Sequence, residues 1–367
     1  MVCDRMVSCK WRIPSDFLTR GHFDRVVREL EWTSSPGYPY CVRHPTNAQF
    51  FEVVDGQPSQ IALDRVWYMV VQRLRDQTSD PIRLFIKPEA HKMSKLLEHR
   101  YRIISSVSVI DQIIDHMLFQ EFNDRVVENV HYVPAKVGWT PYIGGWKMIR
   151  PHGMVSADKT AWDWTVPMWM LDWEFQVRVK LCENMTEQWL DLAAWRYNKL
   201  FVDVTLVTSG GLLLKQRLPG AMKSGSVNTI VSNSIMQDLM HCYICNKLDI
   251  PVGHIWTLGD DTIQEDPGEE YFEELKKLCV IKEIVRGTEF AGHTFDGMHV
   301  SPNYVGKHAY TLLHVDLRHA KEICMSYALL YHRAKPSDKE LIYTALRSLG
   351  ETLPSEAKLD LVFDGSE

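Results

Sequence analysis

The alternation of apolar and polar residues along the chain predicts a mixture of helices and short strands. In the first third, apolar residues recur at helical spacing or alternate in strand fashion in five segments. The predicted helices cover 24–30, 62–77 and 109–127, and the predicted strands cover 82–87 and 102–106. A loop rich in turn-forming residues, 33–39, separates the first two helices.

The middle of the chain predicts two hairpins and two further helices. An apolar run over 154–158 ends in an acidic turn, and apolar residues over 166–181 then recur at helical spacing. The first hairpin pairs 201–208 with 212–217, and the second pairs 253–258 with 262–265. A long helix is predicted between the two hairpins, after Ser224-Gly225.

The C-terminal part is predicted to be mainly helical. A helix over 269–278 and a strand pair near Ile281 and Glu289 come first, and a helix over 317–334 follows. Pro336 precedes a capping box formed by Ser337 and Glu340, which starts a last helix that Gly350 ends. The chain as a whole is therefore expected to be an α+β protein.

Length and composition are those of a soluble globular protein. The 367 residues are enough for one large unit or for two to three packed subdomains, and 45% of them are hydrophobic. No run approaches the roughly 18 apolar residues of a membrane span, and the N-terminus has no signal-peptide core. We therefore expect no transmembrane segment and a cytosolic location.

The eight cysteines have no spacing typical of a disulfide framework, so reduced thiols are expected. Cys242 and Cys245 form one C-x-x-C pair, but no second pair at zinc spacing follows it. Both fall on the apolar stripe of the long predicted helix. A position in the core is therefore favoured over a metal site.

The net charge of −6 argues against a surface that is basic throughout and coats nucleic acid. Charge is nevertheless concentrated locally. The segment 83–102 contains six basic and two acidic residues, a local net charge of +4, which makes it the most positive stretch of the chain. A positive field confined to one channel fits these numbers.

Three carboxylates stand at positions suited to a pair of metal ions. Asp158 ends a predicted strand, and Asp260 and Asp261 form the tip of a predicted hairpin. Phosphodiester synthesis uses two divalent cations roughly 3.5–4 Å apart, and Mg²⁺ prefers oxygen ligands. The carboxylates would converge if the strands are neighbours in one sheet, although Gly-Asp-Asp alone is also a common turn.

The order and spacing of several short motifs resemble those of the viral RNA-dependent RNA polymerases, in particular the sobemovirus-like and luteovirus-like branch. Asp158 and Asp163 match motif A, 224–233 matches motif B, and Gly259-Asp260-Asp261 matches motif C. Other matching segments are Lys87-Pro88-Glu89 with Arg100-Tyr101-Arg102 (motif F), 33–39 (motif G) and Val137-Gly138-Trp139-Thr140-Pro141. The resemblance covers about residues 33–295. Within it, 289–293 matches motif E only loosely.

The resemblance implies roles for the acidic residues and for one lysine. Asp158 and Asp260 would bind two Mg²⁺ or Mn²⁺ ions, with Asp261 as a weaker or alternate ligand. Lys282, in the position of motif D, would act as the general acid that protonates pyrophosphate. Lys276 and Lys277 lie close to it in the sequence and are alternatives.

The resemblance also implies a nucleotide site. Asp163 would face the incoming ribose together with Ser224, Thr229 and Asn233, where a hydrogen-bonded 2′-hydroxyl distinguishes RNA precursors. The alternative role for Asp163 is that of a helix N-cap.

Basic residues and a loop complete the implied site. Lys87, Arg100 and Arg102 would form a positive roof over the triphosphate channel, and the alternative is a solvated basic helix face. Ser35, Gly37 and Pro39 would contact the template RNA. Gly225 would allow close approach of the backbone to template or nucleotide, and the alternative is an ordinary glycine at a helix start.

The fold implied by the resemblance is a right hand with fingers, a palm made of a small antiparallel sheet backed by helices, and a short helical thumb. Residues 1–148 would form the fingers, 149–185 and 219–300 the palm, 186–218 a fingers insertion and 301–367 the thumb. Its partners would be RNA template and product, NTPs, a genome-linked protein primer and other viral replicase proteins, in replication complexes of the host cell cytoplasm.

Two alternatives to this function share the palm. A reverse transcriptase would use the same metal carboxylates but usually has a bulky residue at the position of Asp163. A polymerase-like RNA-binding protein without activity would not need Asp158, Asp260 and Asp261 intact. Replication of a positive-strand RNA virus genome is therefore the function we expect, and the sequence does not choose between primed and unprimed initiation.

Overall fold

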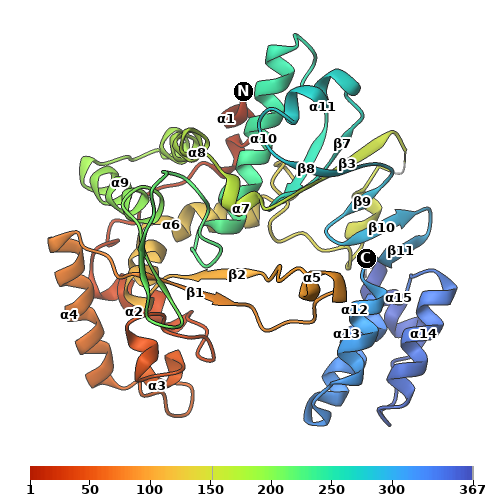
Figure 1. Ribbon diagram of the computed structural model, residues 1–367, viewed down its shortest axis with the longest axis horizontal. Helices are drawn as coiled ribbons and strands as arrows, with labels where there is room; N and C mark the ends of the chain where they lie inside the picture. The colour runs from red at the N-terminus through yellow and green to blue at the C-terminus, as the bar shows by residue number, and fades with distance from the viewer. Residues whose placement is uncertain (151, 366–367) are drawn as a thin grey trace.

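The computed structural model describes residues 1–150 and 152–365 and consists of three small sheets surrounded by helices (Figure 1). The central sheet has the strand order β6-β7-β3-β8, and all its pairings are antiparallel. Its strands are β3 (Met154–Lys159), β6 (Ile255–Leu258), β7 (Asp261–Glu265) and β8 (Ile281–Arg286). β3 lies in the interior of the sheet, and its residues are almost all buried.

Two long helices back the central sheet. They are α8 (Met168–Leu181) and α10 (Thr229–Lys247), which pack on each other, and α10 also packs on β6. Residues of α10 are buried on most sides, including Cys242 and Cys245, so the C-x-x-C pair lies in the core as predicted. The shorter helices near this sheet are α1 (Val2–Arg5), α7 (Trp162–Thr165) and α11 (Glu269–Leu275).

A second sheet has the order β2-β1-β4-β5, in which β1 and β4 are parallel. Its strands are β1 (Ile82–Ile86), β2 (Ile103–Ser106), β4 (Thr205–Thr208) and β5 (Leu213–Lys215). β1 and β2 form a ribbon with the short helix α5 (Met93–Leu97) at its far end, which points toward the C-terminal helices (Figure 1).

Helices around this second sheet form the largest part of the core. They are α2 (Arg20–Arg28), α3 (Asn47–Phe50), α4 (Gln60–Asp76), α6 (Val109–Glu128) and α9 (Glu187–Phe201). Side-chain caps define the starts of α4, α6 and α9, where Ser59, Ser108 and Thr186 accept hydrogen bonds from the first turn. α6 is buried almost all round, and its Asp115 pairs with the buried Arg196.

The C-terminal region has its own sheet and core. The strands β9 (Glu289–Phe290), β10 (His293–Asp296) and β11 (His299–Pro302) are antiparallel. The helices are α12 (Val305–Leu313), α13 (Ala320–Leu330), α14 (Pro336–Arg347) and α15 (Glu356–Asp364). Among the described residues, short 3₁₀ turns lie at Val7–Cys9, Tyr40–Val42 and Gly145–Met148, and a further one, Leu317–His319, lies between α12 and α13. No helix of the described residues is long and apolar enough to span a bilayer.

Several sequence-based predictions about elements are wrong in detail. The strands near Ile281 and Glu289 do not pair with each other, because β8 pairs with β3 and β9 pairs with β10. The segment 201–208 is only half strand, since α9 extends to Phe201. The helix predicted over 317–334 is a 3₁₀ turn followed by α13, which ends at Leu330. Ser337 forms no capping box, because Pro336 begins α14 and Lys335 is its N-cap.

Candidate active site

The pairing of the central sheet brings the three predicted carboxylates to one end. Ala157 of β3 lies opposite Thr262 of β7, and Leu258 of β6 lies opposite Asp261. This register carries Asp158 to the same end of the sheet as the hairpin tip. The tip is shaped by Gly259, whose φ of +63° favours glycine and whose amide donates to Ser234 Oγ at 2.9 Å.

The carboxylates interact electrostatically. Burial raises the pKa of Asp260, and burial together with the charges of Asp260 and Asp158 raises the pKa of Asp261 to about 6. Asp158 also pairs with Lys282, whose Nζ donates to its carboxylate. The described residues contain no group of three His, Cys, Asp or Glu side chains gathered for a metal. Asp158 is turned toward a lysine, so a cation bound there would compete with that ammonium.

A buried lysine that sequence reasoning missed lies next to these carboxylates. Lys159 is 5% exposed, and its Nζ donates to the backbone oxygen of Asp260 at 3.0 Å and to Thr262 Oγ1 at 3.1 Å. It also donates to the backbone oxygen of Ala157 at 3.3 Å. Lys159 therefore ties the hairpin to β3. No sequence pattern marks Lys159, because β3 also contains the polar residues Ser156 and Asp158.

Asp163 and Asn233, which are both predicted to face the ribose, lie in direct contact with each other. Asn233 Nδ2 donates to Asp163 Oδ1 at 2.9 Å, and Asn233 Oδ1 accepts from Trp162 Nε1 at 3.0 Å. Burial raises the pKa of Asp163, while the hydrogen bond from Asn233 opposes that shift. Asp163 lies inside α7, whose N-cap is Ala161, so the alternative N-cap role is wrong.

The other predicted residues of the Ser224–Asn233 segment hold the loop before α10 in place. Ser224 Oγ accepts from the Ser105 amide at 3.0 Å. Thr229 Oγ1 donates to the backbone oxygen of Lys223 at 2.7 Å. A Cβ on Gly225 would lie 2.4 Å from the Ser105 oxygen, so close packing on β2 explains this glycine. Its predicted contact with RNA stays a prediction.

The predicted basic residues lie on the β1–β2 ribbon or next to it. The side chains of Lys87, Arg100 and Arg102 are 43%, 64% and 62% exposed. They are solvated but form no helix face, because this segment is a strand, a loop with α5, and a second strand. The charge of Arg102 lowers the pKa of both Asp163 and Asp260, although the burial of each carboxylate outweighs it. Arg102 therefore lies within electrostatic reach of the carboxylates.

The loop 33–39 is anchored on the start of α6. The Val109 amide donates to the Pro36 oxygen at 2.8 Å, and Ser35 Oγ accepts from the Gly37 amide at 3.3 Å. Gly37 has a φ of +69°, and a Cβ there would lie 2.7 Å from the Val107 oxygen. The bond before Pro39 is cis. These contacts place the loop beside the β2–α6 junction, and its contact with template RNA stays a prediction.

The three candidate lysines for a general acid differ in position. Lys276 and Lys277 pair with Glu273 and Glu274 within or next to α11. Lys282 instead lies on β8, the neighbour of β3, and pairs with Asp158. Of the three, Lys282 is the one whose described contacts join it to the predicted metal ligands.

Carboxylates on an antiparallel sheet, with a basic strand pair within electrostatic reach, form the arrangement expected of a template-directed polymerase. Comparison with known proteins specifies the class further. Residues 22–278 match the family model described as viral RNA-dependent RNA polymerase. The chain belongs to this family, as the motifs predicted, and the match favours it over a reverse transcriptase.

Relatives from several viruses are similar to this chain. Protein P1-P2 of Potato leafroll virus (strain Potato/Netherlands/Wageningen/1989) is 33% identical over 324 residues, covering 78% of this chain and 29% of that protein. Protein P1-P2 of Pea enation mosaic virus-1 is 29% identical over 335 residues, covering 80% and 27%. The RNA-directed RNA polymerase of Mushroom bacilliform virus is 26% identical over 310 residues, covering 77% and 74%. The chain thus spans less than a third of either P1-P2 relative.

Proposed function

We propose that this chain is the polymerase part of a viral replicase and copies a positive-strand RNA genome from NTPs. The observation that carries the proposal is the position of Asp158 at the same end of one sheet as Asp260 and Asp261. Asp158 comes from a part of the chain far from the adjacent pair Asp260 and Asp261, and the three carboxylates repel one another. A site that gathers negative charge in this way suits divalent cations.

The donor set fits Mg²⁺ or Mn²⁺. Asp158 and Asp260 would hold two ions, with Asp261 as an alternate ligand, because hard cations prefer carboxylate oxygens. When bound, the ions would lower the pKa of the attacking 3′-hydroxyl and neutralise charge on the triphosphate. Lys282 and a bound cation would compete for the Asp158 carboxylate, so the Lys282 ammonium would be available for another role when the site holds its ions.

The remaining residues would orient the nucleotide and move a proton. Lys282, once released from Asp158, would donate a proton to the pyrophosphate oxygen as the phosphodiester bond forms. Arg102, with Lys87 and Arg100, would stabilise charge growing on the leaving phosphates. Asp163, held by Asn233, would accept a hydrogen bond from the ribose 2′-hydroxyl.

The arrangement of elements supports a right-hand organisation. We assign the central sheet with α8 and α10 to the palm (149–185 and 219–300). The β1–β2 ribbon and its helices would be fingers (1–148, with an insertion at 186–218), and α12 to α15 a short thumb (301–367). Lys307 of α12 pairs with Glu89 near α5 at 3.2 Å, so these two parts meet (Figure 1).

Partners would follow from the wider replicase. Relatives that include a replicase polyprotein of Southern cowpea mosaic virus suggest that further replicase segments accompany this chain. RNA template and product, NTPs and a genome-linked protein primer would be its ligands. We propose the host cell cytoplasm, in replication complexes, as its location.

An incorporation assay tests this function. Purified protein, an RNA template, labelled NTPs and Mg²⁺ or Mn²⁺ should give templated RNA, with and without a primer. Asp260→Ala should reduce incorporation by at least about 10³-fold, because a metal ligand is lost. Asp191→Ala, an exposed aspartate on α9, is the matched control and should keep full activity. Undiminished synthesis by Asp260→Ala would refute the assignment.

A further inference from the structure

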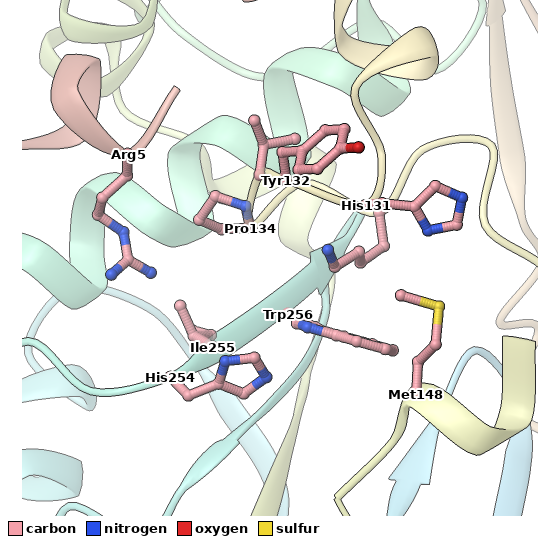
Figure 2. Close-up of a pocket in the computed structure, with 10 residues that line it drawn as sticks. Arg5, His131, Tyr132, Pro134, Met148, His254, Ile255 and Trp256 are labelled. Atoms are coloured by element: carbon pink, nitrogen blue, oxygen red, sulfur yellow. The ribbon is translucent and has the colours of Figure 1, made fainter. Parts of the chain in front are cut away.

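A pocket that is separate from the carboxylates lies on the central sheet, at the opposite end of β6 from the Gly259-Asp260 tip. Its volume is about 420 Å³, within the range of small-molecule sites. Arg5 of α1 reaches it from one side, and His131 and Met148 reach it from the other, with His254 and Trp256 of the β6 segment between them (Figure 2). The full lining is Arg5, His131, Tyr132, Val133, Pro134, Lys136, Met148, His254, Ile255 and Trp256.

The pocket is built on backbone pairing and is therefore preformed. The amide of Lys136 donates to the Thr257 oxygen at 2.7 Å, and the amide of Thr257 donates to the Pro134 oxygen at 3.0 Å. The loop between α6 and β3 thus adds a short parallel extension to β6. This pairing holds the side chains of the loop and of β6 in fixed relative positions.

Lys136 is a buried cation without an anionic partner among the described residues. It is 3% exposed, and its Nζ donates to the Val130 oxygen at 2.7 Å and lies 4.7 Å from the Trp256 ring centre. Burial lowers its pKa to about 8, so the ammonium form still dominates at neutral pH. A buried ammonium with one hydrogen bond has two N–H groups left for a ligand.

Arg5 supplies a second cationic group. Its Nε donates to both carboxylate oxygens of Asp238, at 3.0 and 3.3 Å. Within the part of the chain that the structure describes, its two Nη groups have no hydrogen-bond partner. The two Nη groups of Arg5 can therefore donate two parallel hydrogen bonds to one phosphate or carboxylate.

Charge and shape together define the ligand class. The described lining residues include no Asp or Glu, while Arg5 and Lys136 are cationic and His131 and His254 offer ring nitrogens. Burial first, and then the charges of Arg150, Lys136 and Arg5, lower the pKa of His254 to about 4. Asp238 neutralises Arg5 and Glu265 neutralises Arg150, whereas none of the described carboxylates pairs with Lys136. Pro134, Ile255 and Met148 add an apolar wall.

We propose that this pocket binds a nucleoside monophosphate, with the phosphate at Arg5 and Lys136 and the base against the apolar wall. The choice of a nucleotide over other phosphate esters rests on the proposed function, whereas the phosphate site itself does not. The pocket and the carboxylates lie at opposite ends of a strand, so a ligand here would occupy neither the metal site nor the ribose site.

Calorimetric titration without metal ions tests the proposal. GMP should bind the wild-type chain, inorganic phosphate should bind more weakly, and guanosine should not bind. In His131→Glu, which adds a negative charge at the exposed mouth, the affinity for GMP should fall by at least about tenfold. His319→Glu, the same change on an exposed histidine beside α13, is the control and should bind as the wild type does. A melting curve for each variant verifies folding.

Further arms separate the possible results. Asp260→Ala should keep its affinity for GMP even if it makes no RNA, because the pocket does not use that carboxylate. Loss of GMP binding in Asp260→Ala, equal binding of guanosine, or unchanged affinity in His131→Glu would each overturn the proposal. A 5′-phosphorylated dinucleotide is titrated beside GMP. Tighter binding of the dinucleotide would identify the ligand as the 5′ end of an RNA chain, and tighter binding of GMP would identify it as a free nucleotide. Binding of neither one would also overturn the proposal.

Discussion

At the scale of single residues, the site depends on how a few side chains hold the carboxylates. Asp158 is exposed enough to pair with Lys282, while Asp260 and Asp261 are mostly buried and repel each other. Lys159 lies beneath the hairpin and bonds to the backbone of Asp260 rather than to its carboxylate. It is therefore a positioning residue for the tip.

Lys159→Met tests that positioning role. The change keeps much of the apolar stem but removes three hydrogen bonds, so RNA synthesis should fall about 10–100-fold, the range for groups that orient metal ligands. The Mg²⁺ concentration for half-maximal rate should rise. Lys180→Met, an exposed lysine on α8, is the control. An unchanged Mg²⁺ dependence in Lys159→Met would contradict the role.

Asp163→Ala tests the nucleotide site. Removing this carboxylate leaves Asn233 bonded to Trp162 but takes away the proposed acceptor for the ribose 2′-hydroxyl. Discrimination between NTPs and dNTPs should drop by at least about tenfold. In the wild type a dNTP would leave the Asp163 carboxylate without the hydrogen bond from the 2′-hydroxyl, and in the variant that penalty is gone. The ratio of kcat/KM values for the two substrates on one RNA template measures this. The assignment fails if the ratio is the same as in the wild type.

At the scale of elements, junctions between segments far apart in sequence organise the site. Two hydrogen bonds hold the loop before α10 against β2: the Ser105 amide donates to Ser224 Oγ, and the Gly225 amide donates to the Ser105 oxygen. The loop 33–39 is held against the start of α6. Both predicted RNA-contacting segments are thus attached to the same β2–α6 region.

Gly225→Ala tests the first junction. The new Cβ would lie 2.4 Å from a backbone oxygen that cannot move aside easily, so the free energy of unfolding should fall by about 1–3 kcal/mol. Gly210→Ala is the control, because its nearest neighbour would be 3.9 Å away. Denaturant unfolding of both variants gives the comparison. Equal free energies of unfolding for Gly225→Ala and Gly210→Ala would contradict the tight packing of this loop on β2.

The sequence predicted those elements correctly whose formation depends on the local pattern of apolar residues. The strand and hairpin carrying Asp158 and Asp260 form as predicted, and so does α6, because apolar runs and turn residues coincide there. The pairing of β8 with β3 could not be predicted, since strand partners over 120 residues apart leave no local pattern. The break after Leu317–His319 and the helix α15 likewise depend on packing within the C-terminal core.

At the scale of the whole molecule, the largest hydrophobic core joins the helices around the second sheet to α8 and α10 of the central sheet, while a separate core holds the C-terminal helices. The ion pair between Lys307 and Glu89 links the far end of the β1–β2 ribbon to α12. The motifs identified the family, and they predict Asp158, Asp260 and Asp261 as metal ligands. They gave no sign of Lys159 or of the pocket around Lys136, because both depend on contacts between distant segments.

The binding of Mn²⁺ tests the central claim most directly, namely that carboxylates from separate strands share divalent ions. Electron paramagnetic resonance titration with a non-hydrolysable NTP analogue should detect tight Mn²⁺ sites in the wild-type chain and in Asp191→Asn. Asp260→Asn and Asp158→Asn, which keep the side-chain shape, should each lose tight binding. Wild-type Mn²⁺ affinity in both of these variants would contradict the account.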